Sequence, residues 1–174
     1  MIASTIALAA FSASAQMYGE IGGTAAKYQA QALGYPVESF PTAIRGIFGY
    51  EISPNLAIEA VAAFGVSADK VKFSGVTIPG ANFKVNNLYG IYAKPKYQFT
   101  PEFEGFIRAG FAYSKGTLSI GAQNASASEN SFSYGLGVSY AVTKATSINA
   151  DYMSYLDKNN STATGYTFGI GYKF

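Results

Sequence analysis

Residues 131–142 read SFSYGLGVSYAV, a stretch in which large apolar side chains alternate with small or polar ones. A period of two is the pattern of a β-strand, because successive side chains point to opposite faces. Residues 166–174, YTFGIGYKF, repeat the pattern. Each stretch therefore has one large apolar face and one small or polar face.

Phrases rich in turn-forming residues separate such stretches. Residues 50–56 read YEISPNL, residues 97–103 echo them as YQFTPEF, and residues 140–146 do so more loosely as YAVTKAT. Because Pro and Asn favour tight turns and avoid central strands, each phrase predicts a short hairpin. The alternation then predicts eight strands, at residues 17–27, 42–52, 56–66, 85–99, 103–115, 131–142, 146–156 and 163–174.

The expected connections alternate in length along the chain. Short turns are expected near Ser53, Thr100 and Lys144, and longer loops at residues 28–41, 67–84, 116–130 and 157–162. Short turns at one end and longer loops at the other are typical of barrels in the bacterial outer membrane.

The composition indicates that the large apolar face contacts lipid. Hydrophobic residues make up 49% of the chain, whereas charged residues make up 13%, about half of the usual share in a soluble domain. A soluble lipocalin-like barrel is the alternative, but it would turn its large apolar residues inward and its charges outward. Beyond the N-terminus there is no apolar run long enough for a helical span, which leaves a closed barrel to satisfy the backbone in lipid. We predict an all-β fold, an eight-stranded antiparallel up-and-down transmembrane β-barrel.

The N-terminal residues resemble a targeting segment. An apolar run from Ile2 to Phe11 is followed by Ala13-Ser14-Ala15, a signal-peptidase site of the Ala-x-Ala kind. No Lys or Arg precedes Lys27, so a basic region is missing and we expect the segment to be truncated. The expected domains are a signal peptide at residues 1–15 and an exported barrel at residues 16–174; a buried helix or first strand is the alternative for the former.

Strand alternation predicts ten charged side chains on the inner face. Five acids and five bases make this set neutral. On the lipid face each charge would cost about 2–4 kcal/mol near the midplane, whereas inside the barrel the charges can pair. These charges have two possible roles. They can simply pack the lumen, or they can form a gated pore in which ion pairs exchange partners. The ten residues are Glu20, Arg45, Glu51, Glu59, Lys94, Lys96, Glu104, Arg108, Asp151 and Lys173.

Three segments resemble a known family. Residues 93–110, AKPKYQFTPEFEGFIRAG, resemble a strand-turn-strand unit of the OmpA transmembrane domain, and residues 49–59 and 169–174, GYEISPNLAIE and GIGYKF, resemble the same family. The resemblance extends to other small barrels, including OmpX and the neisserial surface proteins. It implies a bacterial outer membrane location, and a last strand in which Tyr172 and Phe174 act as an assembly signal for the barrel assembly machinery.

The resemblance also implies roles for luminal charges. Glu59 is similar by position to a central acid that gates OmpA-like barrels, and Lys94 to one of its alternative partners. Asn149 and Ser139 stand where the family has an Arg and a second Glu, so that switch is only half present. OmpA itself continues into a peptidoglycan-binding domain, and we expect that activity to be missing because this sequence stops at Phe174.

The expected function is a structural role in membrane integrity with slow leakage of small solutes, and no cofactor. Cys and His are both absent, and the Ser-x-x-Lys spacing of Ser67 and Lys70 is of a kind that arises by chance, so we expect no enzyme activity. The alternative is a surface adhesin or host-factor binder, because residues 67–84 carry Lys70, Lys72 and Lys84 against Asp69.

Expected partners are outer membrane lipids, lipopolysaccharide, the assembly machinery and periplasmic chaperones. A net charge of +2 does not suggest nucleic acid, and the protein is expected to be a monomer.

Overall fold

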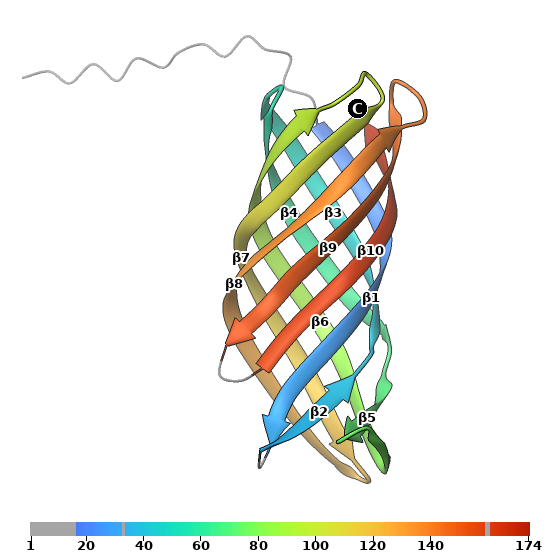
Figure 1. Cartoon of the computed structure of the whole chain (residues 1–174), viewed down its shortest axis with the longest axis vertical. Helices are drawn as coiled ribbons and strands as arrows, with labels where there is room; N and C mark the ends of the chain where they lie inside the picture. Colours follow the sequence, from blue (N-terminus) through green and yellow to red (C-terminus); the bar gives the residue numbers. More distant parts are fainter. Residues whose placement is uncertain (1–16, 33, 159–160) are drawn as a thin grey trace, which may run out of the picture.

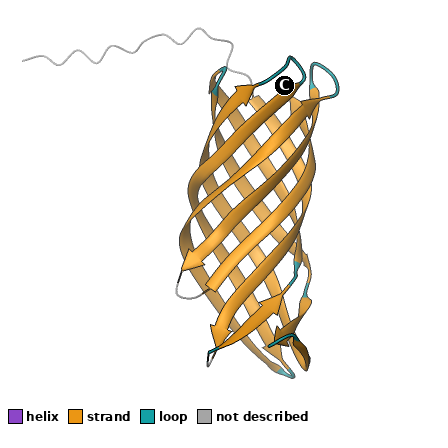
Figure 2. Ribbon diagram, in the orientation of Figure 1, coloured by secondary structure: helices purple, strands orange, loops and turns teal. Residues whose placement is uncertain are grey.

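The structure is a computed structural model that describes residues 17–32, 34–158 and 161–174. The proposed signal peptide, residues 1–15, lies outside the described residues. Within the described ranges the regular structure is all strand (Figure 2), and no helix is long and apolar enough to cross a membrane. The strands are β1 (Met17–Ala32), β2 (Tyr35–Ser39), β3 (Thr42–Ser53), β4 (Leu56–Ser67), β5 (Asp69–Phe73), β6 (Val76–Gln98), β7 (Phe103–Ile120), β8 (Gln123–Ala141), β9 (Thr146–Lys158) and β10 (Ser161–Lys173).

Eight of these strands close into a ring. The order is β10-β9-β8-β7-β6-β4-β3-β1, and β1 pairs with β10 to complete it. All neighbours are antiparallel, and the strands run obliquely around a long barrel (Figure 1). The predicted eight-stranded antiparallel barrel is confirmed.

The two remaining strands prolong the wall. β2 pairs with β1 and β5, and β5 pairs in turn with β6. β2 therefore continues the line of β3 along β1, and β5 continues the line of β4 along β6. The end of the barrel that carries these strands is called here the hairpin end, and the opposite end, which carries the three short turns, the turn end (Figure 1). About 9–11 tilted residues suffice to cross a membrane, so β6, with 23 residues, extends well beyond it.

The long loops expected at residues 28–41, 67–84 and 116–130 are wrong. Most of these residues are strand, and the actual reversals are tight turns near Gly34, Ser74-Gly75 and Gly121, whose positive φ angles suit such turns. Small and polar side chains weaken the alternation in these segments, whereas pairing with antiparallel neighbours supplies backbone hydrogen bonds; β8 pairs with β7 from Gln123 onward, and with β9 from Tyr134 onward. The fourth expected loop, residues 157–162, lies partly in β9 and β10 and partly outside the described residues.

The outer face is the lipid-facing surface expected from the composition. Phe111 and Ile91 are 72% and 69% exposed. Aliphatic side chains lie between two belts of outward aromatic ones, the arrangement that membrane barrels use at the two interfaces. The belt at the turn end consists of Phe48, Tyr50, Tyr97, Phe99, Phe103, Tyr140, Tyr172 and Phe174, and the other of Phe64, Tyr89, Phe111, Tyr113, Phe132, Tyr134, Tyr152, Tyr166 and Phe168.

Candidate functional site

Six charged side chains meet inside the middle of the barrel and are called here the central cluster. Each comes from a different strand of the ring, and three are acids and three are bases. All are buried; Glu59 is 0% and Arg108 is 1% exposed. The six are Glu20 on β1, Arg45 on β3, Glu59 on β4, Lys94 on β6, Arg108 on β7 and Asp151 on β9.

Arg108 is the hub of the central cluster. Its Nε donates to Glu59 Oε2 at 2.5 Å, its Nη1 to Asp151 Oδ2 at 2.6 Å, and its Nη2 to Glu20 Oε2 at 2.9 Å. Lys94 Nζ lies 3.3 Å from Glu20 Oε1 and 3.4 Å from Glu59 Oε1. Arg45 Nη1 donates to Asp151 Oδ1 at 2.9 Å, and its Nη2 pairs with the other oxygen. Every carboxylate of the cluster therefore contacts two bases.

Aromatic side chains complete the surroundings of these charges. The Tyr18 hydroxyl donates to Glu59 Oε1 at 2.6 Å. The ring centroid of Phe106 lies 4.4 Å from both Lys94 Nζ and Arg108 Cζ, which is cation–π geometry. Sequence reasoning missed both aromatic residues because it assigned large rings to the lipid face. Strand parity could have found them, since Tyr18 shares its face with Glu20, and Phe106 shares its face with Arg108.

An apolar layer fills the lumen on the hairpin side of the central cluster. The prediction that the inner face is only small or polar is wrong at this level, because the interior of an eight-stranded barrel is just wide enough for side chains to fill, and bulky apolar ones fill it here. The Tyr155 hydroxyl joins the two levels by accepting a hydrogen bond from Arg45 Nη1 at 3.0 Å. The layer consists of Ile47, Val61, Ala63, Leu88, Tyr92, Ala112, Met153 and Tyr155.

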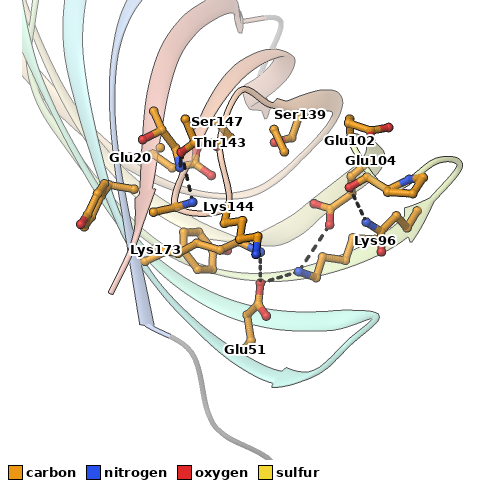
Figure 3. Close-up of a pocket in the computed structure, with 18 of the residues that line it drawn as sticks. Glu20, Glu51, Lys96, Glu102, Glu104, Ser139, Thr143, Lys144, Ser147 and Lys173 are labelled. Carbon is orange, nitrogen blue, oxygen red and sulfur yellow. Dashed lines mark hydrogen bonds and ion pairs between the residues drawn. The ribbon is translucent and has the colours of Figure 1, made fainter.

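A second ionic cluster lies at the turn end (Figure 3). Lys96 Nζ is 2.6 Å from Glu51 Oε1 and 3.4 Å from Glu104 Oε2, and Lys173 Nζ is 3.5 Å from Glu51 Oε1. The four line a cavity of about 230 Å³ that reaches inward to Glu20. This cluster is also neutral, but it is less enclosed, since the Lys173 side chain is 40% exposed.

The structure places the ten predicted luminal charges in these two clusters, six in the centre and four at the turn end. Asn149 is buried inside the barrel, and Ser139 lines the turn-end cavity. Tyr172 and Phe174 face outward, 52% and 70% exposed. Within the described part of the chain, no group of acids is arranged to hold a metal ion.

Comparisons with known proteins agree with this architecture. The chain is similar to neisserial surface protein A (20% identity, TM-score 0.71, 91% of this chain and 97% of that one). It is also similar to Ail of Yersinia pestis in complex with the heparin analogue sucrose octasulfate (18%, TM-score 0.64, 92% and 99%). A third similar structure is the N-terminal barrel of Pseudomonas aeruginosa OprF (16%, TM-score 0.63, 92% and 99%).

At these identities the solved structures establish the fold alone, and a comparison with curated proteins gives no match. The family model described as "Outer membrane protein beta-barrel domain" matches residues 2–174. The match spans both ionic clusters and all ten described strands. The chain therefore belongs to the outer membrane β-barrel family and is a bacterial outer membrane protein.

Proposed function

We propose that this protein is a closed, non-enzymatic structural barrel that supports the integrity of the outer membrane and leaks small solutes only slowly. The observation that carries the proposal is the filled middle of the lumen. Cavities open at the two ends of the barrel, but the innermost charges, Arg45, Glu59, Arg108 and Asp151, line neither of them. The central cluster and the apolar layer together form a plug between the cavities.

The energetics of the plug favour the closed state. Separating one buried ion pair costs about 3–5 kcal/mol when a charge is left without its partner. Since each 1.4 kcal/mol is a factor of ten, a form opened by one such break would be populated at about 1% or less. A gate that works by exchanging partners would therefore open rarely, which is consistent with slow leakage.

Planar-bilayer recording of the refolded protein tests this proposal. The parent should stay closed for most of the recording. Glu59→Ala/Arg108→Ala removes one acid and one base from the plug, keeps the lumen neutral, and should raise the time spent conducting about tenfold or more. The matched control is Glu51→Ala/Lys96→Ala, which also removes a neutral pair but from the turn-end cavity, and it should conduct like the parent.

Two results would count against a plug. One is a parent protein that conducts steadily, which would make the barrel an open pore. The other is an equal gain of conductance in both double variants, because the position of the missing pair would then not matter.

A second candidate function, binding of anionic molecules at the cell surface, is favoured by lysines on the outer wall near the hairpin end. Lys27 Nζ and Lys72 Nζ lie 5.7 and 5.5 Å from the ring centroid of Phe40, which is 43% exposed. Lys70 and Lys84 lie on the neighbouring strands β5 and β6. These four lysines, called here the lysine patch, would face phosphate or sulfate groups above the membrane, such as those of lipopolysaccharide. Glu38, 3.3 Å from Lys27, offsets part of the charge.

A further inference from the structure

The hairpin end encloses a second cavity of about 470 Å³, on the hairpin side of the plug. Its walls come from strands all around the barrel and are mainly apolar. The apolar side chains that line it include Val37, Val71, Phe83, Leu88, Leu118 and Leu156. A lumen of this chemistry is unusual, because the interiors of membrane barrels are normally polar.

Several of the polar side chains around this cavity are already paired with the protein, and Ser114 and Lys115 also belong to its lining. The hydroxyls of Thr24 and Thr167 are 2.8 Å apart, and the Ser39 hydroxyl donates to the Asp69 carbonyl at 3.3 Å. The Tyr28 hydroxyl contacts Ser161 Oγ at 3.4 Å. Water needs two to four polar partners to be held in a cavity, and these walls offer few. An apolar molecule would replace such water at little cost.

The shape of the cavity gives the direction of entry. Ala63, Leu88 and Tyr155 belong to both the cavity lining and the apolar layer, so the plug closes the inner side. Tyr28 and Phe83 stack with ring centroids 4.5 Å apart and stiffen the wall. The volume is within the range of small-molecule sites, about 300–1,000 Å³. A ligand would therefore enter from the hairpin end and stop at the plug.

We propose that this cavity is a binding site for a small, uncharged, largely apolar molecule that arrives from outside the cell and is held without passing through the barrel. The carboxylate of Glu129, which lines the cavity, lies 3.3 Å from Lys158 Nζ at an exposed position. With that pair at the hairpin end and an apolar interior, the site selects against charged ligands. The inference goes beyond the structural role proposed above: it relies on the same plug for the statement that the ligand does not pass through, whereas the binding test below does not depend on conductance.

The test is binding of N-phenyl-1-naphthylamine, an uncharged probe that fluoresces in apolar surroundings. The protein is embedded in phospholipid nanodiscs, because detergent would itself compete for the cavity. Empty nanodiscs give the linear partitioning of the probe into lipid. The parent protein should add a saturable component with one site per barrel.

Two substitutions on β8 test whether the saturable binding of the probe takes place in the cavity. Ala127 lines the cavity, so Ala127→Phe should fill it and weaken saturable binding by at least about tenfold. Ser128 follows it on the opposite face of β8, paired with Lys115, and Ser128→Phe adds a ring without entering the cavity. This control should bind within about twofold of the parent. Heat-modifiable gel mobility checks that both barrels are folded.

A second cavity variant keeps the test usable if Ala127→Phe does not fold. Leu118→Gln keeps most of the volume but places an amide in the apolar wall, so it should also weaken the saturable component. Binding that is equal in all folded variants, or that never exceeds the partitioning into empty nanodiscs, overturns the proposal.

Discussion

Glu59 is the most enclosed charge of the lumen, and its removal is the sharpest test of the central cluster. Glu59→Ala takes away an acceptor used by Arg108, Lys94 and the Tyr18 hydroxyl. Because those buried donors would keep fewer partners, we expect the free energy of unfolding to fall by about 3–5 kcal/mol. Urea unfolding followed by heat-modifiable gel mobility measures the loss.

Glu102→Ala is the matched control for that loss. It also removes one carboxylate, but from the exposed turn between β6 and β7, where Glu102 accepts a hydrogen bond from Thr100 at 3.2 Å. Its stability should change by less than about 1 kcal/mol. If both variants unfold at the same urea concentration as the parent, Glu59 is not held in a buried pair.

Strand alternation could predict which charges face inward but not which ones pair; only the contact between Glu59 and Lys94 was implied, by the family resemblance. Alternation along each strand is a local property, so the inward side of Glu59 or Arg108 follows from the residues beside it. Pairing depends on how strands far apart in the sequence are staggered around the ring. Glu20 and Lys94, which lie on strands that are not neighbours, meet only once the barrel closes. The aromatic partners Tyr18 and Phe106 were missed because composition favoured the lipid face for every ring.

Close contact between β6 and β7 depends on glycine at position 110. A Cβ added to Gly110 would overlap the Ile91 carbonyl oxygen and lie 2.8 Å from the Tyr92 Cα. Because backbone atoms cannot move aside as a flexible side chain can, Gly110→Ala should cost about 1–3 kcal/mol. Gly23→Ala on β1 is the control, since a Cβ there meets nothing within 4 Å. Equal urea midpoints for the two variants would show that β6 and β7 can make room for a Cβ at position 110 without loss of stability.

The strands of the hairpin end show where sequence patterns stop being informative. In residues 116–130, GTLSIGAQNASASEN, few large side chains remain to mark alternation, and the composition looks like that of a loop. The structure nevertheless pairs β7 with β8 continuously from Phe103 to Ile120. Their register continues from the membrane-spanning part, so each new pair costs little chain entropy once the previous one has formed. Extension of this kind is a consequence of the barrel and not of local propensity.

The distribution of charge along the whole barrel separates its two ends. The two luminal clusters are each neutral, so they contribute little to the field outside the barrel. At the hairpin end the lysine patch is opposed by Glu38 and by Asp69, whose carboxylate accepts a hydrogen bond from the Phe40 backbone N–H at 2.9 Å. If the hairpin end faces the cell exterior, as the long end does in outer membrane barrels, this patch meets the outer leaflet and its anionic groups.

We expect the location of the lysine patch at the hairpin end to determine binding of anionic molecules. The test measures how the nanodisc-embedded protein binds heparin and lipopolysaccharide vesicles. Lys70→Ala/Lys72→Ala removes two positive charges from the lysine patch and should weaken binding at low salt, with the difference shrinking as salt screens the charges. Lys144→Ala/Lys173→Ala removes the same charge from the turn end and should bind like the parent. If both double variants lose the same amount of binding, net charge alone explains it. The two variants remove the same charge and differ only in the end of the barrel from which they remove it. A loss for vesicles but not for heparin would assign the patch to the membrane itself, whereas the reverse would assign it to a soluble polyanion.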